Sequence, residues 1–461
     1  MDDGLFNVSI SLFAVSSFGY LAATVFYLVL LARESKTVGW LATGILWVTV
    51  AAHTAALTTR WFVSGWHQPP WTNLYESLVY FAWGVGLVYA IFEVRAKNRL
   101  AGAFVIPIAF ILMGLAALSQ DKEVAQVMPA LQSRWLHIHV SFACFAYAAF
   151  FTGFGFAFLY LVRDGVTAVR MLPWAAAGLF VTIVALEYGD LVKYGEFTFD
   201  SYRISAEGGV EMYPLVAPYV GPLSVAAGLF SLSVIVAGLA DRYRENPEFM
   251  SGGRASGAGR SYALAVEKLA ALCARIIPRG PYVLITSAVT LLLLIAVIAV
   301  AIRFGWATRP IPMKPEMSLL QIGLNAYKLS LLVVSVFSIG ILLVVHAAGA
   351  GFPARLPEAA ILDRWSYKSI LVGLVLMTLV LITGSIWANY AWGRFWSWDP
   401  KENWALITLL TYAAYMHARM ARSWSPKATA VFAIVGIVVV IFTYLGVNLF
   451  LGGLHSYGRP S

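Results

Sequence analysis

The stretch WGRFWSWDPKENW (Trp392–Trp404), called the tryptophan loop below, holds four tryptophans, two acids and two bases. A single tryptophan in such a place is usually an anchor at the membrane–water interface. That explanation accounts neither for the density of rings nor for Asp399, Lys401 and Glu402 among them. Aromatic rings stack on the faces of a flat ligand, and Lys401 or Arg394 can pair with its acidic groups. The loop therefore predicts a site for a large planar ligand that carries carboxylates.

Haem has this shape, and its iron takes one or two axial ligands, commonly imidazole. His139 and His455 are the candidates, because each lies at the end of a predicted span on the side of the tryptophan loop. A lone histidine at a span end is usually structural, so it is their combination with the loop that favours ligation, and neighbouring His137 is the weaker candidate. His53 and His417 fall within predicted spans, where ionisable groups are functional by default. Hydrogen bonding between helices is the alternative for both.

The composition places these residues in a membrane protein. The chain has 461 residues, of which 60% are hydrophobic and 12% charged, with a mean hydropathy of +0.76. Soluble proteins carry about 25% charged residues. The net charge of +9 does not call for a nucleic-acid partner, because membrane proteins concentrate Lys and Arg on cytoplasmic loops. Cys144 and Cys273 form no Cys-x-x-Cys pair, so neither thiol redox chemistry nor a cysteine-ligated metal is expected.

Apolar runs long enough to cross a hydrocarbon layer of about 30 Å recur along the whole chain. They predict an all-α, polytopic transmembrane bundle of about 12 spans, with both termini on the outer side. The acidic start, Met1-Asp2-Asp3, lacks a basic region, so no cleavable signal peptide is expected. The predicted spans lie near residues 11–32, 38–58, 74–93, 101–118, 137–162, 172–189, 214–240, 281–302, 324–349, 367–387, 404–420 and 428–451.

The distribution of basic residues predicts the orientation. Most of the 32 Lys and Arg residues follow odd-numbered spans, which makes those loops cytoplasmic. The bias depends largely on segment 241–280, whose Gly/Ser/Arg-rich middle is typical of a flexible linker. In this orientation the tryptophan loop, His139 and His455 face outward.

Several motifs together resemble the CcsA/ResC family of haem-handling proteins of cytochrome c maturation. The tryptophan loop and the helix after it resemble the family's WWD signature. PPWTNLYESLVYFAW (Pro69–Trp83) resembles the early outer segment of the family. LQSRWLHIHVSFACFAYAAF (Leu131–Phe150) resembles its first outer-histidine region, and GVNLFLGGLHSYG (Gly446–Gly458) its second. The motifs occur in the family's order.

The resemblance implies roles for individual residues. His139 and His455 correspond to the two outer axial ligands of haem b, and His417 to the histidine that binds haem within the bilayer. The second ligand of that inner haem is attributed in the family to the partner CcsB (ResB), and His53 is a weaker candidate within this chain. The platform that holds haem at the outer surface corresponds to Trp392, Gly393, Trp396, Trp398, Asp399, Lys401, Glu402 and Trp404.

The resemblance covers residues 1–163 and 354–461, which are expected to form one CcsA-like bundle. Residues 164–353, with the cytoplasmic linker 241–280, are predicted to be an insertion. An even number of spans in it would leave the sidedness of the tryptophan loop unchanged.

The resemblance implies a haem-exporting subunit of a cytochrome c synthase in the plasma membrane. Its site would present haem on the outer face for thioether attachment to the Cys-x-x-Cys-His segment of an apocytochrome c. The chain would then be part of a haem-lyase complex with a CcsB/ResB-like partner. The alternative is a haem transporter or chaperone that passes haem to another carrier without forming the covalent bond. A third reading, a small-molecule transporter with interfacial tryptophans, predicts no bound haem.

Overall fold

A computed structural model describes residues 3–33, 35–65, 68–71, 73–118, 133–194, 199–204, 210–215, 220–245, 258–277, 281–307, 326–421 and 424–447. The chain divides into two compact units. Unit 1 comprises Met1–Gly165 and Ala348–Ser461, and unit 2 comprises Val166–Ala347. The boundaries lie close to those predicted for the insertion, and each unit is described by itself below.

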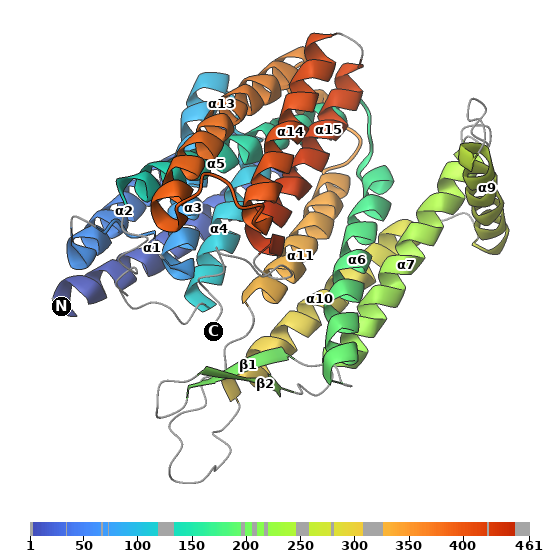
Figure 1. Ribbon diagram of the computed structural model, residues 1–461. Coiled ribbons are helices and arrows are strands. Elements are labelled where there is room, and N and C mark those ends of the chain that lie inside the picture. The colour runs from blue at the N-terminus through green and yellow to red at the C-terminus, as the bar shows by residue number, and fades with distance from the viewer. Residues whose placement is uncertain are drawn as a thin grey trace. The chain divides into compact units, whose positions relative to one another are not determined.

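Unit 1 is a bundle of helices from both ends of the chain (Figure 1). Its elements are α1 (Asp3–Ala32), α2 (Lys36–Ser64), α3 (Leu74–Ala96), α4 (Gly102–Leu118), α5 (Arg134–Arg163), α12 (Phe352–Arg355), α13 (Ala359–Trp392), α14 (Pro400–Met420), α15 (Pro426–Ile441) and the π-helix η2 (Phe442–Gly446). Unit 2 contains α6 (Ala168–Tyr194), β1 (Phe199–Ile204), β2 (Val210–Leu215), α7 (Val220–Glu245), α9 (Ala258–Ile276), α10 (Tyr282–Ala307) and α11 (Ala326–Ala347). Its two short strands form an antiparallel pair, with Phe199 opposite Leu215.

The structure is that of a polytopic helical membrane protein, as predicted. Among the described residues, eight helices are long and apolar enough to cross a membrane, and three shorter apolar helices accompany them. Each of the twelve predicted spans overlaps a helix of the structure. The number of spans that cross the bilayer and the side of the termini stay predictions.

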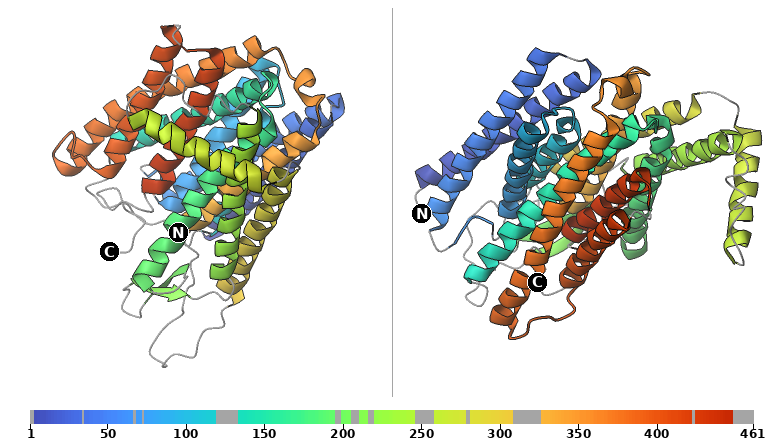
Figure 2. Two further views of the ribbon diagram at one scale, coloured as in Figure 1. Left: turned by 90° about the vertical axis from the view of Figure 1, so that its right-hand side faces the viewer. Right: turned by 90° about the horizontal axis from the view of Figure 1, so that it is seen from above.

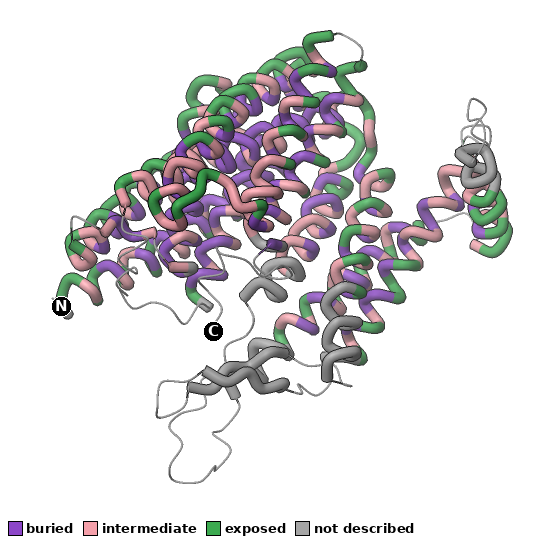
Figure 3. Tube along the Cα trace, viewed as in Figure 1, coloured by how far each residue is buried: buried purple, intermediate pink, exposed green. Residues whose placement is uncertain are grey.

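The centre of unit 1 is formed by α5 packed against α13, which come from distant parts of the sequence. Small residues permit this close approach, as is usual between membrane helices. A Cβ atom on Gly373 would lie 2.6 Å from the ring of Phe150, and one on Gly153 would lie 2.8 Å from Ile370. Phe150 stacks in turn on Tyr412 of α14, with ring centroids 3.7 Å apart. Figure 3 shows the buried residues running through this part of unit 1.

Side-chain contacts establish which helix ends of unit 1 meet. The tryptophan loop joins the end of α13 to the start of α14, and Trp404 contacts Phe442 of η2 with ring centroids 4.2 Å apart. The Tyr444 hydroxyl lies 3.1 Å from that of Ser77 near the start of α3. The end of α13, the starts of α3, α5 and α14, and η2 therefore share one end of unit 1. The end of α1, the start of α2 and the end of α3 lie at the other (Figures 1 and 2).

Candidate functional site

The tryptophan loop is folded by its own acidic residues. Asp399 is buried and caps α14, its side chain accepting from the Lys401 amide at 2.9 Å. Glu402 accepts from the amides of Ser397 at 2.8 Å and Asp399 at 3.2 Å, which completes a capping box. Pro400 stands at the first helical position, where its fixed φ favours the helix. The two carboxylates therefore hold the shape of the loop.

Two residues of the loop adopt left-handed backbone conformations. Gly393 ends α13 with φ +71°, and its amide donates to the Asn389 carbonyl at 2.9 Å. Trp398 has φ +60°, which is rare for a bulky side chain and characteristic of functional sites. The Asn403 amide group donates to the Trp398 carbonyl at 3.0 Å. Trp398 is 71% exposed, and its ring lies edge-on to that of Trp396, with centroids 6.0 Å apart.

Lys401 supplies a cation beside these rings. Its side chain is half-buried in the first turn of α14. Burial lowers the pKa of its ammonium to about 8, against the opposing attraction of the Asp399 carboxylate. Arg394, the other basic residue of the loop, is exposed. A carboxylate that reached Lys401 would favour the charged form and raise this pKa.

His139 lies in the first part of α5 and packs against α13. Its Nδ1 is 2.9 Å from the carbonyl oxygen of Val380. A ring held by Nδ1–H donation to a carbonyl carries the lone pair on Nε2, the arrangement typical of metal-binding histidines. Gly384 makes this position possible, because a Cβ atom there would lie 2.8 Å from Cε1 and 2.9 Å from Nδ1 of His139.

A row of aromatic rings connects His139 with the tryptophan loop. The imidazole is nearly parallel to the Trp387 ring, with centroids 6.1 Å apart and an interplanar angle of 12°. Trp387 meets Trp392 edge-on at 4.9 Å. His139 and the loop thus belong to one continuous structure built on about the last four turns of α13.

His137, two residues earlier, faces another part of unit 1. Its ring lies 6.1 Å from that of Trp71, which stacks on Tyr80 of α3 at 4.4 Å. Residues two apart on a helix point in nearly opposite directions. The structure therefore separates the two histidines, with only His139 on the side of α13.

His53 and His417 occupy different surroundings. His53 is fully buried on α2, with Nδ1 3.2 Å from the Tyr20 hydroxyl and the Phe13 ring edge-on at 5.6 Å. Its Nε2 has no hydrogen-bond partner within the described part of the chain. His417 is exposed on α14, about 24 Å along the helix from Lys401. α2 packs chiefly on α1 and α3, whereas α14 packs on α13 and α15, so the structure does not bring the two histidines together.

The second predicted axial ligand, His455, lies outside the described residues. The described chain ends at Val447, directly after η2. Short π-helical turns often occur at functional sites. Here η2 sets the end of α15 against Trp404, and the Thr443 hydroxyl donates to the Trp404 carbonyl at 3.2 Å.

Comparison with known proteins identifies the class. A family described as cytochrome C assembly protein matches residues 71–189 and 281–455. The chain belongs to this family, a family of cytochrome c biogenesis proteins. The match includes residues 166–189 and 281–347 of unit 2, so the predicted insertion stays a prediction, and the unmatched part within it is 190–280.

Individual relatives agree with the resemblance drawn from the motifs. The chain is 30% identical over 405 residues to the cytochrome c biogenesis protein CcsA of Nostoc sp., covering 87% of this chain and 84% of that one. It is 30% identical over 422 residues to CcsA of Synechocystis sp., with coverages of 90% and 87%. The predicted kinship with CcsA is confirmed. A solved structure of the cytochrome c heme lyase CcmF overlays at 14% identity with a TM-score of 0.29, covering 98% of this chain and 72% of that one. That TM-score does not establish a shared fold.

Proposed function

We propose that this protein is the haem-handling subunit of a membrane cytochrome c synthase and presents haem b at the tryptophan loop. The observation that carries the proposal is the position of His139. Its imidazole is oriented by the Val380 carbonyl at 2.9 Å and stacks with the Trp387 ring, which in turn contacts Trp392 at the start of the loop. An oriented imidazole beside the rings of the tryptophan loop is suited to binding an iron porphyrin.

The second axial ligand in this proposal is His455. It follows Val447 by eight positions in the sequence, a length that reaches at most about 28 Å when extended. The described chain ends at Val447, five residues after Phe442, whose ring contacts that of Trp404. Ligation by two imidazoles would leave the iron no open position, which limits side reactions with oxygen.

The tryptophan loop provides the other contacts. The exposed Trp398 ring offers a face for the porphyrin. Lys401 pairs with a haem carboxylate, and that pairing becomes stronger as the side chain is shielded from water. Asp399 and Glu402 contribute by keeping the loop folded.

The chemistry that follows is addition of a cysteine S–H across each vinyl C=C of haem, with no leaving group. The thiols come from the Cys-x-x-Cys-His segment of an apocytochrome c. Holding the porphyrin rigidly at the surface raises the effective concentration of vinyl groups at the incoming thiols. On the distribution of Lys and Arg, we place the tryptophan loop at the outer face of the plasma membrane.

A row of exposed residues on one face of α14 supports the proposal that a partner protein binds there within the bilayer. Ile407, Leu410, Ala414 and His417 are all exposed and recur at the three- and four-residue spacing of one helix face. A histidine pointing into lipid would be unusual, because ionisable groups in membranes face protein or a cavity. We therefore place the inner haem at this row, with its other ligand from a CcsB/ResB-like subunit.

Haem retention on purification tests the proposed axial ligand. His139→Gly protein is expected to lose most of its bound haem and to regain a haem spectrum with added imidazole, which fills the vacated position. His137→Gly is the matched control, because it removes a neighbouring histidine on the other face of α5. Equal spectra for wild-type and His139→Gly proteins would refute the assignment.

Co-expression with an apocytochrome c and the partner separates a synthase from a chaperone. A synthase leaves haem on the apocytochrome after denaturing electrophoresis. Haem bound to this chain without covalent product would favour the transporter or chaperone instead.

A further inference from the structure

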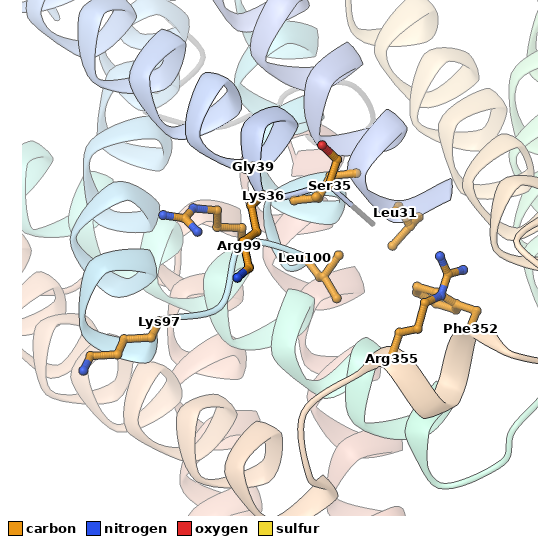
Figure 4. Close-up of a pocket in the computed structure, with 10 residues that line it drawn as sticks. Leu31, Ser35, Lys36, Gly39, Lys97, Arg99, Leu100, Phe352 and Arg355 are labelled. Carbon is orange, nitrogen blue, oxygen red and sulfur yellow. The ribbon is translucent and has the colours of Figure 1, made fainter. Parts of the chain in front are cut away.

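A basic pocket lies at the end of unit 1 opposite the tryptophan loop. Its volume is about 160 Å³, and it is lined by the end of α1, the start of α2, the segment joining α3 to α4, and α12. Four of its ten lining residues are cations, namely Lys36, Lys97, Arg99 and Arg355, and none of the ten is acidic (Figure 4).

The two arginines are fixed by neighbouring groups. The Arg99 Nε donates to the Thr43 hydroxyl at 2.9 Å, and its guanidinium lies 4.0 Å from the centre of the Trp40 ring. The buried Glu93 carboxylate is 3.9 Å from the same Nε. Arg355 donates to the Ala32 carbonyl at 3.3 Å. These contacts hold both cations in the wall of the pocket.

The lysines leave the pocket with an excess of positive charge. Lys36 and Lys97 are exposed and form no ion pair with any described residue. Lys36 is also the first residue of α2, whose N-terminus carries a partial positive charge. Among the described residues, Glu93 forms an ion pair with Arg99 alone, and Glu93 does not line the pocket.

The size and lining of the pocket select the kind of anion. A protein cavity of about 150 Å³ accommodates benzene, which has six heavy atoms, so this space suits a group of about that size, such as a phosphate ester. A porphyrin is several times larger. Leu31, Leu100 and Phe352 give the pocket apolar walls beside the cations. The pocket also lies at the ends of three candidate membrane spans, at Ala32, Lys36 and Ala96, where the headgroups of a bilayer would be.

We propose that this pocket binds the phosphate headgroup of an anionic phospholipid, with Lys36, Lys97, Arg99 and Arg355 as its ligands. Basic pockets between the ends of transmembrane helices are suited to such headgroups. The ligands come from α2, the segment after α3, and α12, so the lipid contacts both of the sequence segments that form unit 1. The proposal does not depend on haem binding.

Native mass spectrometry of the purified full chain tests the proposal, with phosphatidylglycerol, phosphatidylcholine and inorganic phosphate as separate probes. The double variant Lys36→Gln/Lys97→Gln is expected to bind phosphatidylglycerol about 25-fold more weakly, from about fivefold for each basic residue. Arg33→Gln/Arg95→Gln is the matched control, because both arginines are exposed at the same helix ends and do not line the pocket. Lys36→Arg/Lys97→Arg keeps the charge and is expected to retain binding.

Two results would overturn the proposal. One is equal binding of phosphatidylcholine and phosphatidylglycerol by the wild-type protein. The other is an equal loss of phosphatidylglycerol in the control and pocket variants, which would indicate a general surface charge effect. Displacement of phosphatidylglycerol by inorganic phosphate in wild type alone would support phosphate as the recognised group. Binding of phosphate without any binding of the lipid would refute a lipid site.

Discussion

Gly384→Ala is a small change that probes the support of His139. The added Cβ atom would lie 2.8 Å from Cε1 and 2.9 Å from Nδ1 of the imidazole. Carbon atoms in contact prefer about 3.5–4.0 Å, so the ring must move by about 0.7 Å or more. Val380 is on the same helix one turn earlier, so this movement also lengthens the 2.9 Å hydrogen bond to its carbonyl. At about 3.6 Å the bond no longer exists.

The expected effect is on haem rather than on folding. Loss of one hydrogen bond costs about 0.5–1.5 kcal/mol of stability, and the gain in helix propensity from Gly to Ala offsets about 0.5–1 kcal/mol of that. Loss of the group that orients a metal-binding histidine lowers affinity about 10- to 100-fold. Haem titration followed by visible absorption measures this directly, and thermal unfolding measures the change in stability.

The control for this experiment is Gly44→Ala, in the first third of α2. A Cβ atom on Gly44 meets nothing within 4 Å, so the substitution adds helix propensity without touching a neighbour. It is expected to leave haem affinity unchanged. Wild-type haem affinity in Gly384→Ala protein would refute the orientation of His139 by α13.

Three further predictions concern the tryptophan loop and α14. Asp399→Ala removes the cap of α14 and is expected to lower the free energy of unfolding by about 1 kcal/mol and to lower haem retention. Asp399→Asn still caps the helix and is expected to keep most of the stability and most of the haem. Comparison of melting temperatures and haem content of the two variants checks this. Because the pKa of Lys401 is lowered to about 8, haem affinity is expected to decrease as the pH rises above 8, where the neutral amine no longer pairs with a carboxylate. Lys401→Arg is expected to abolish this decrease in equilibrium haem titrations. The stability of the haem-free protein is expected to change with pH in the opposite direction to haem affinity. Between pH 8 and about 10.4 the unfolded chain holds the Lys401 proton and the folded chain does not, so the free energy of unfolding rises with pH there. His417→Gly is expected to lower the haem content of the complex with the partner but not that of the chain purified alone. Met420→Gly, also exposed on α14, is expected to retain the haem of the complex. Loss of haem from the complex in both variants would indicate damage to the helix.

The helical architecture was predictable because the bilayer imposes a simple rule on the sequence. A span needs about 20 apolar residues, and each predicted span overlaps a helix. The ends were less accurate. The predicted span 214–240, for example, overlaps β2, which ends at Leu215, and α7, which begins at Val220. A run of apolar residues does not reveal where a short strand ends and a helix begins.

The role of the acids in the tryptophan loop had a signal in the sequence. Asp399-Pro400-Lys401-Glu402 has the spacing of a capping box with proline at the first helical position. That pattern explains why two carboxylates lie among the rings without assigning them to a ligand.

Pairings across the bundle could not be read from the sequence. The contact of His139 with Val380 joins residues 241 positions apart, and Gly384 matters only because that imidazole lies against it. The pocket of Lys36, Lys97, Arg99 and Arg355 likewise exists only after α12 is packed beside α1 and α2. Such sites depend on tertiary packing rather than on local pattern.

The most direct measurement is the electron paramagnetic resonance spectrum of the oxidised protein purified with its haem, compared with those of the His139→Gly and His455→Gly variants. The account predicts a low-spin ferric signal typical of two imidazole ligands in the wild-type and His137→Gly proteins. It predicts loss of that signal in both variants, with recovery on addition of imidazole. A wild-type low-spin signal that survives either substitution would contradict the claim that haem is held between these two histidines.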